Sequence, residues 1–338
     1  GYTNRVGRIS QEGLSEAFDD WNSGEITKAQ LDQVISAWVN GERVVEDGIY
    51  VVTIDSNITE DTVLEREPDG MPAGDQVVYQ MQDYIGVPAE LVIEAGVAIE
   101  FQQQAGIDIK NGGTIIGNGT ADEPILMTGT LAKRGWWNSL LVRTPGLQNS
   151  LAHTIVEYGG RDNGCVRVRG DGGNEGLLEL SNCTLRQSGT YGLTLGGGGA
   201  LRGDSGGNTY TGNRAATVYA RTRNIHTLSA DSTYTDNDGD YVLVESKNVN
   251  GEGPDETQRT WAALDVPYRI QGDFFNINNL ELVIEPGAVF EFSQGTKLFL
   301  QNGTRLTWSG VLEDGTVEPI VFTGTDEQRG WWDGIVIN

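Results

Sequence analysis

A long internal repeat is the feature of this sequence that most constrains its fold. Residues 91–101 and 282–292 share Leu-Val-Ile-Glu, a turn around Gly, and a second short segment that ends in Glu-Phe. Three further matches follow in the same order: Glu123-Pro124-Ile125 with Glu318-Pro319-Ile320, Thr128-Gly129-Thr130 with Thr323-Gly324-Thr325, and Arg134-Gly135-Trp136-Trp137 with Arg329-Gly330-Trp331-Trp332. Such ordered matches indicate a repeat architecture, in which each unit buries its apolar face against its neighbour.

A shorter period lies between the two copies. Ile155, Leu185, Tyr210 and Tyr234 centre similar short segments at spacings of 30, 25 and 24 residues. Segments such as Val-Arg-Val at 166–168 alternate apolar and variable residues, as a half-buried strand does, and turn-forming residues separate them. Both periods predict stacked coils of short parallel strands, that is, a β-solenoid.

The repeat also carries a resemblance to a known family. The segments Leu-Val-Ile-Glu-Pro-Gly at 282–287, Glu-Pro-Ile-Val-Phe-Thr at 318–323 and Gly-Trp-Trp-Asp-Gly-Ile-Val-Ile at 330–337 resemble right-handed parallel β-helix repeat proteins. These are large secreted or surface-exposed chains of the pectin-lyase-like superfold. The resemblance covers about residues 49–338 and implies an all-β, right-handed parallel β-helix. It implies little about activity, because this superfold hosts many functions.

We therefore expect three segments. Residues 1–48 form a helical hairpin that acts as a cap or docking module, residues 49–253 form a first β-helix module, and residues 254–338 form a second, incomplete one. The second module stops one strand after its tryptophan pair, and an uncapped solenoid end leaves an open edge. We expect truncation, end-to-end self-association with another chain, or a larger parent protein.

The expected hairpin rests on helical periodicity over residues 10–40. Thr27 followed by Gln30 is a capping box, which predicts the start of a second helix. The periodicity places two tryptophans, Trp21 and Trp38, on the inward side. The segment faintly resembles a dockerin-like or EF-hand-like unit. In that alignment Trp21 occupies a ligand position and Gln30 replaces the closing glutamate, so the calcium chemistry is degraded. A packed cap or docking module is expected, and a calcium site is the alternative.

The charge balance excludes several functions. The chain has 23 basic and 48 acidic residues, a formal net charge of −25. Binding to nucleic acid or to an anionic membrane surface needs the opposite sign, so neither is expected as a main role. The longest apolar run is far shorter than the ~20 residues that span a bilayer. The acidity fits either solubility in a salty setting or uptake of divalent cations.

Candidate metal ligands gather near residue 236. Asp236, Asp238 and Asp240 place carboxylates at alternate positions, with Asp231 nearby, in a pattern that calcium prefers. Tyr241 replaces the glycine of a calcium loop, however, and the same segment fits an ordinary polar turn. Calcium therefore stays an alternative, and the sequence requires no cofactor.

The sequence contains no catalytic constellation that we can align. His153 and His226 both fall in strand-like segments, and no serine lies in a nucleophile elbow. Cys165 and Cys183 are too few for a disulfide framework or a zinc site. They either pair with each other or lie as small buried side chains.

Arginines gather in the middle of the chain. On a solenoid, residues one coil apart line up along one face, and a row of guanidinium groups can grip carboxylates or sulfates of an acidic glycan. Eight arginines lie between residues 161 and 223. Six of them are the candidate glycan-binding residues: Arg161, Arg167, Arg169, Arg186, Arg202 and Arg221. The other two are Arg214 and Arg223. The alternative is that each arginine pairs with a nearby acid.

The double tryptophans are a second candidate for glycan contact. Adjacent strand residues face opposite sides, so one tryptophan of each pair is expected in the core and the other outside or under a loop. An exposed indole stacks well on a sugar ring, which makes Trp136 and Trp331 candidates. Because the pair recurs with the repeat, a structural role in the coil is the alternative.

Together these patterns predict a non-catalytic, extracellular or cell-surface rod that serves adhesion, glycan binding or structural display. Its expected partner is a polysaccharide or a cell-surface glycan. The alternative is a polysaccharide lyase or glycoside hydrolase that acts on an acidic glycan along the β-helix face, through carboxylates or a basic residue.

Overall fold

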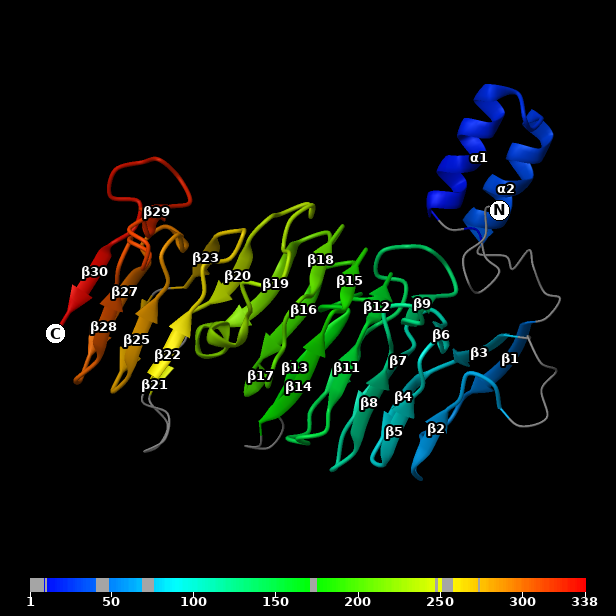
Figure 1. Ribbon diagram of the computed structural model, residues 1–338, viewed down its shortest axis with the longest axis horizontal. Coiled ribbons are helices and arrows are strands. Elements are labelled where there is room, and N and C mark those ends of the chain that lie inside the picture. Colours follow the sequence, from blue (N-terminus) through cyan, green and yellow to red (C-terminus); the bar gives the residue numbers. More distant parts are fainter. Residues whose placement is uncertain are drawn as a thin grey trace.

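The computed structural model is a parallel β-solenoid with a helical hairpin near its N-terminal end (Figure 1). It describes residue 9 and residues 11–40, 49–68, 76–170, 175–246, 249–250, 258–272 and 274–338. Strands pair in parallel from coil to coil along the long axis, and the longest sheet marks about nine turns. The predicted all-β solenoid is confirmed.

The longest sheet has ten strands and runs along nearly the whole solenoid. It crosses the boundary expected near residue 253, which itself lies outside the described residues. Its strands are β4 (Tyr84–Val87), β7 (Gly106–Ile109), β10 (Leu140–Val142), β13 (Val166–Arg169), β16 (Tyr191–Gly196), β19 (Ala216–Arg221), β20 (Val242–Glu245), β23 (Tyr268–Gln271), β26 (Val289–Phe292) and β29 (Val321–Gly324).

Two shorter sheets complete the first part of the solenoid. A seven-stranded sheet contains β1 (Ile49–Ile54), β3 (Gln76–Met81), β6 (Ala98–Phe101), β9 (Ile125–Gly129), β12 (Thr154–Glu157), β15 (Thr184–Arg186) and β18 (Thr209–Thr211). A six-stranded sheet contains β2 (Thr62–Leu64), β5 (Glu90–Ile93), β8 (Thr114–Asn118), β11 (Ser150–Ala152), β14 (Gly176–Ser181) and β17 (Gly199–Leu201).

The second part of the solenoid begins after a short 3₁₀-helix, η1 (Thr222–Thr227), which follows β19. A four-stranded sheet contains β21 (Val249–Asn250), β24 (Phe274–Asn278), β27 (Lys297–Gln301) and β30 (Gly334–Ile337). A three-stranded sheet contains β22 (Gln258–Trp261), β25 (Glu281–Ile284) and β28 (Arg305–Trp308). Only the ten-stranded sheet links the two parts by strand pairing within the described residues.

The strands form because apolar and outward-facing residues alternate. In β13, Val166 and Val168 are buried, whereas Arg167 and Arg169 lie on the outer side. Val166 pairs with Leu193 of β16, so that like side chains superpose from coil to coil. Each buried aliphatic side chain contributes about 1.5–3 kcal/mol, and these columns form one continuous core.

The two copies of the internal repeat make the same individual side-chain contacts. Trp137 stacks on Phe101 with ring centroids 4.0 Å apart, and Trp332 stacks on Phe292 at 4.5 Å. The first tryptophan of each pair instead donates its indole N–H to a threonine at 2.9 Å, from Trp136 to Thr130 and from Trp331 to Thr325. The two copies therefore build the same coil from the same inward side chains.

Asparagine side chains support one corner of the solenoid. The backbone N–H of Ser188 donates to Asn213 Oδ1, and the N–H of Asn213 donates to Asn237 Oδ1, both at 3.0 Å. The N–H of Asn237 donates in turn to Asp240 Oδ1 at 2.8 Å. Each step satisfies a backbone group that the turn leaves without a strand partner.

The hairpin consists of α1 (Gln11–Ser23) and α2 (Lys28–Asn40), as predicted. Thr27 and Gln30 form the expected capping box, in which the N–H of Thr27 donates to Gln30 Oε1 at 2.9 Å. The expectation that Trp21 faces inward is wrong, because its side chain is 41% exposed. The contact face between two helices is narrow, and the buried side chains of Ala17 and Leu31 fill it, which leaves Trp21 outside.

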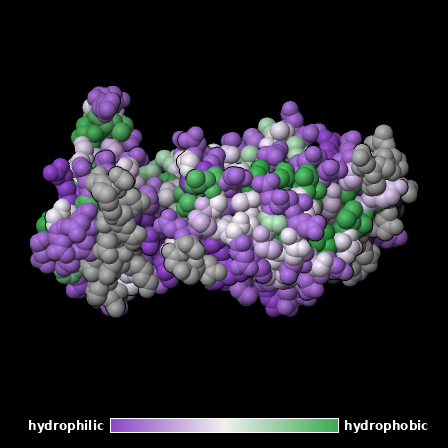
Figure 2. All heavy atoms as spheres, turned by 90° about the horizontal axis from the view of Figure 1, so that it is seen from below, coloured by the Kyte–Doolittle hydropathy of each residue, from purple (hydrophilic) through white to green (hydrophobic). Residues whose placement is uncertain are grey.

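The outer surface is mainly hydrophilic on the face shown in Figure 2, where hydrophobic side chains form small separate groups. Within the described residues, no helix has the length and apolar character that crossing a membrane requires.

Candidate functional site

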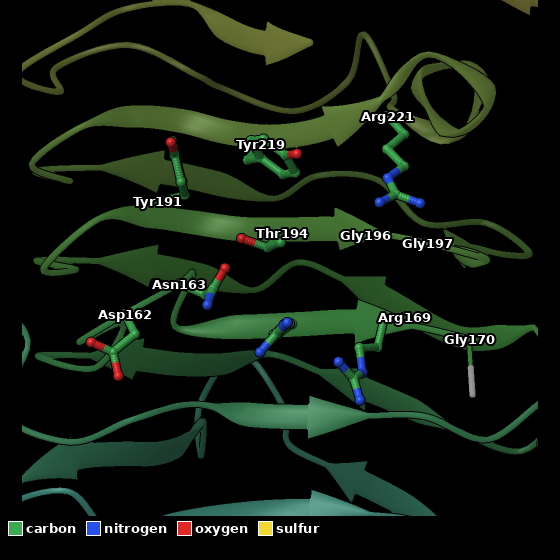
Figure 3. A pocket seen from close by; sticks show the side chains of 11 residues that line it. Asp162, Asn163, Arg169, Gly170, Tyr191, Thr194, Gly196, Gly197, Tyr219 and Arg221 are labelled. Carbon is green, nitrogen blue, oxygen red and sulfur yellow. The ribbon is translucent and has the colours of Figure 1, made fainter. Parts of the chain in front are cut away.

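A hollow of about 470 Å³ lies on the outer face of the ten-stranded sheet, over β13, β16 and β19 (Figure 3). We call it the arginine groove, because three of the six candidate arginines lie in it. The lining residues are Asp162, Asn163, Arg167, Arg169, Gly170, Tyr191, Thr194, Gly196, Gly197, Tyr219 and Arg221.

Strand register places these side chains in two rows. In the first row, Arg167 pairs with Thr194, which pairs with Tyr219. In the second row, Arg169 pairs with Gly196, and Arg221 follows next to Gly196 on β19. Neighbouring strands lie about 4.8 Å apart, so guanidinium and phenol groups recur along the solenoid axis at short intervals.

Arg167 and Arg169 have no acidic partner among the described residues. Their Nε atoms are buried and without a hydrogen bond. Arg143, which follows β10 directly, instead donates from Nε to Asp108 at 2.8 Å. Burial and the neighbouring charge of Arg169 lower the pKa of Arg167. A partly buried cation without a counter-charge is unfavourable, so an anion bound here would stabilise this surface.

Arg221 is partly neutralised inside the protein. Its Nε donates to Glu245 Oε2 at 3.1 Å, and the hydroxyl of Tyr219 donates to the same oxygen at 2.7 Å. Burial and the carboxylate of Glu245 raise the pKa of Tyr219 to about 12. The side chain of Arg221 is still 37% exposed, so its outer N–H groups remain open to a ligand.

Tyrosines give the groove an aromatic wall. The rings of Tyr191 and Tyr219 lie 5.5 Å apart, tilted by 41°. Tyr84 lies further along the same sheet, where its ring covers Gly106; a Cβ on that glycine would come within 2.6 Å of the ring. Burial, followed by the charge of Asp108, raises the pKa of Tyr84. The phenol rings of Tyr191 and Tyr219 are partly exposed, and they offer an apolar face with a polar rim, which suits a sugar.

One turn closes the groove beside these rows. Asp162 and Asn163 come from the turn before β13, and the N–H of Gly164 donates to Thr194 Oγ1 at 3.0 Å. This bond fixes the turn against the next coil. Asp162 is the one carboxylate among the described lining residues.

The other candidate arginines lie elsewhere. Arg186, on the seven-stranded sheet, donates from Nε to Glu157 Oε2 at 2.7 Å. Arg202 follows β17 of the six-stranded sheet and pairs with Glu179 at 3.1 Å. Arg161 is exposed in the turn that carries Asp162. The solenoid thus divides these arginines among its faces, instead of lining all six along one.

The sequence reasoning missed the tyrosines of the groove. Tyr219 and Arg221 alternate on one strand with the buried Val218 and Ala220, so the period of two predicts that they share the outer face. Coil spacing alone could not show which strands belong to the same sheet.

Trp136 and Trp331 lie partly buried, and each donates its indole N–H to a threonine within the coil. Trp137 is fully buried, as expected for one member of that pair. Neither Trp136 nor Trp331 lines the arginine groove.

The acidic cluster does not converge on one point. Asp238 accepts hydrogen bonds from Arg134 Nη1 on both oxygens at 3.0 Å, and Asp240 accepts from the N–H of Asn237. Asp236 lies in the turn with φ at 64°. Within the part of the chain that the structure describes, no group of three or more His, Cys, Asp or Glu residues could hold a metal ion.

The two cysteines are free and buried, so the second of the two sequence interpretations is confirmed. Burial raises the pKa of Cys165 to about 12 and that of Cys183 to about 11, which keeps both thiols protonated and unreactive near neutral pH.

Comparison of the chain with protein-family models, with curated proteins and with solved structures found no match.

Proposed function

We propose that this chain is an extracellular β-solenoid of the pectin-lyase-like kind that binds an acidic polysaccharide in the arginine groove without cleaving it. The observation that carries the proposal is the pair Arg167 and Arg169, which have no acidic partner among the described residues and whose Nε atoms are buried without a hydrogen bond there, on a chain of net charge −25. Arg186 and Arg202, by contrast, each form an ion pair with a glutamate of the chain, although the Nε atom of Arg202 is likewise buried without a hydrogen bond. An anion from another molecule supplies what the groove lacks.

The overall acidity does not prevent such binding. Repulsion between the chain and a polyanion is screened beyond about 8 Å at physiological ionic strength. Contacts within the groove are shorter than this, and they are charge-assisted hydrogen bonds from guanidinium groups. The local charge of the groove therefore decides the affinity.

The tyrosines favour a sugar chain as the ligand. Tyr191 and Tyr219 stand beside the arginines, so a ring that stacks on a phenol can place its acidic group on a guanidinium. The arginines lie on β13 and β19 and the tyrosines on β16 and β19, so the groove offers both kinds of side chain over three successive coils.

Binding without hydrolysis is favoured by the lining of the groove. Glycoside hydrolysis commonly needs two carboxylates on either side of the bond, and Asp162 is the one carboxylate among the described lining residues. A lyase or hydrolase that acts along this face stays the alternative, and the assay below is designed to detect it.

The test is calorimetric titration with alginate, pectate and sulfated glycans, together with assays for unsaturated ends and reducing sugar. We expect binding without turnover. The Arg167→Gln/Arg169→Gln variant should lose affinity by at least ~10-fold, because each lost charge-assisted hydrogen bond contributes about 1.5–3 kcal/mol.

The control is Arg202→Gln, which removes one guanidinium charge from a different face. It should bind as the unaltered protein does. Absence of binding to every glycan, or an equal loss in Arg202→Gln, would contradict the proposal. Turnover that depends on Arg167 would overturn the proposal of binding without cleavage and would favour the lyase alternative.

A further inference from the structure

A notch interrupts the second row of the arginine groove at Gly196. A Cβ added to Gly196 would meet Thr194 Cγ2 at 4.0 Å and nothing nearer. A Cβ added to Gly197 would lie 3.9 Å from Gly170 N and 4.0 Å from Arg221 Nη1. The two glycines thus leave open space beside a guanidinium group, which we call the Gly196 notch.

Arginines from two strands line the hollow that contains the notch. Arg221 extends from β19 toward Gly196 and Gly197 (Figure 3). Arg167 and Arg169 of β13 line the same hollow, and Arg169 is directed away from Gly196 (Figure 3). The guanidinium groups of Arg167 and Arg169 have no acidic partner among the described residues, and Glu245 occupies only Nε of Arg221. The carboxylate of Asp162 lies at the far side of the groove from Arg221 (Figure 3).

We propose that the Gly196 notch seats a sulfate ester of the bound glycan. This inference rests on the proposed function. A carboxylate has two oxygens in one plane and is satisfied by one arginine fork, as Asp108 is by Nε and Nη2 of Arg143. A sulfate ester has three terminal oxygens in a pyramid, so besides Arg221 it can accept from a second guanidinium group of the hollow, which Arg167 and Arg169 also line. Its bulk also fits where the second row has no side chain.

The test compares chondroitin with chondroitin sulfate, which share a backbone and a uronic carboxylate and differ in the sulfate ester. We expect the sulfated chain to bind about tenfold tighter. Gly196→Leu should fill the notch and abolish this preference, so that the variant binds the two chains with equal affinity. Gly196→Ala should reduce the preference in part.

Both variants should fold, because Gly196 lies on the outer side with open space around its Cβ position and without a positive φ. Circular dichroism checks this. The matched control is Leu243→Ala, a change on the outer side of β20 in the same sheet that should leave both affinities unaltered.

Each other outcome is distinct. Equal binding of the two chains, or a preference that survives in Gly196→Leu, overturns the sulfate seat and leaves the proposed function standing. Absence of binding to either chain, and to the polyuronates, overturns the proposed function itself. A single-stranded oligonucleotide that binds as tightly as chondroitin sulfate overturns the assignment to a glycan sulfate.

Discussion

The two copies of the internal repeat agree in their interiors and differ in the sheets that they join. In the first copy, β6 belongs to the seven-stranded sheet and β7 to the ten-stranded sheet. In the second copy, the equivalent β26 belongs to the ten-stranded sheet and β27 to the four-stranded sheet. The same local sequence thus builds the same coil in both copies. The ten-stranded sheet, however, takes β7 from the first copy and β26, the equivalent of β6, from the second.

This difference teaches which side chains specify the coil. Inward groups, such as the stacked Phe101 and Trp137, recur with the repeat because the interior is close-packed. Outward groups do not have to recur. The arginine groove lies on β13, β16 and β19, between the copies, where outward side chains can serve a ligand without altering the core.

The largest expected effect on the free energy of unfolding is at the stacked tryptophans, where the two copies can be compared directly. Trp137→Ala should lower the free energy of unfolding by about 3–5 kcal/mol, because the ring is fully buried. Trp332→Ala should cost roughly half of this, because its ring is only partly buried. Urea unfolding followed by circular dichroism measures both, and equal losses would contradict the comparison.

The second effect concerns alkaline stability, which depends on buried thiols found in the first part of the solenoid alone. The folded state raises the pKa of Cys165 from 9.0 to about 12 and that of Cys183 from 9.0 to about 11. Below pH 9 both thiols are protonated in both states, so stability is retained. As the pH rises above about 9, the unfolded chain ionises first and stability falls.

Each thiol contributes about 1.4 kcal/mol per pH unit in this window. Unfolding free energies at about pH 7 and about pH 10, measured under reducing conditions, should therefore differ by about 2–3 kcal/mol. The Cys165→Ala/Cys183→Ala variant should lose most of that difference, apart from the onset of tyrosine ionisation. An unchanged pH dependence in the variant would show that other groups cause it.

The interior could be predicted from the sequence further than the site could. The short period and the internal repeat predicted the solenoid, and the capping box at Thr27 predicted the start of α2, because both are local patterns. The division of Arg167 and Arg186 between two sheets was not predictable, since coil lengths vary: Ile85 pairs with Ile107, yet Ile107 pairs with Leu140. Position within a coil, not distance along the chain, decides which face a residue joins.

A smaller difference in the free energy of unfolding is expected between two ion pairs, Arg186 with Glu157 and Arg269 with Glu291. Glu157 is buried, so Arg186→Ala should cost roughly 2 kcal/mol, less than the 3–5 of a fully buried pair because the arginine side chain is 34% exposed. In the second part, Glu291 is 23% exposed, so Arg269→Ala should cost about 1 kcal/mol or less. Thermal unfolding measures both variants. A greater loss for Arg269→Ala would reverse the expected order.

The smallest effect tests the hydrogen bonds that the two copies share. Trp136→Phe keeps an aromatic ring but removes the bond to Thr130, which is buried, and should cost about 1 kcal/mol. Trp331→Phe removes the equivalent bond to the exposed Thr325, where water replaces the lost partner, and should cost about half as much or less. Double-mutant cycles with Thr130→Val and Thr325→Val isolate each coupling energy. A coupling at Trp331 as large as that at Trp136 would mean that burial does not set the strength of these bonds, and that the second copy is held as tightly as the first.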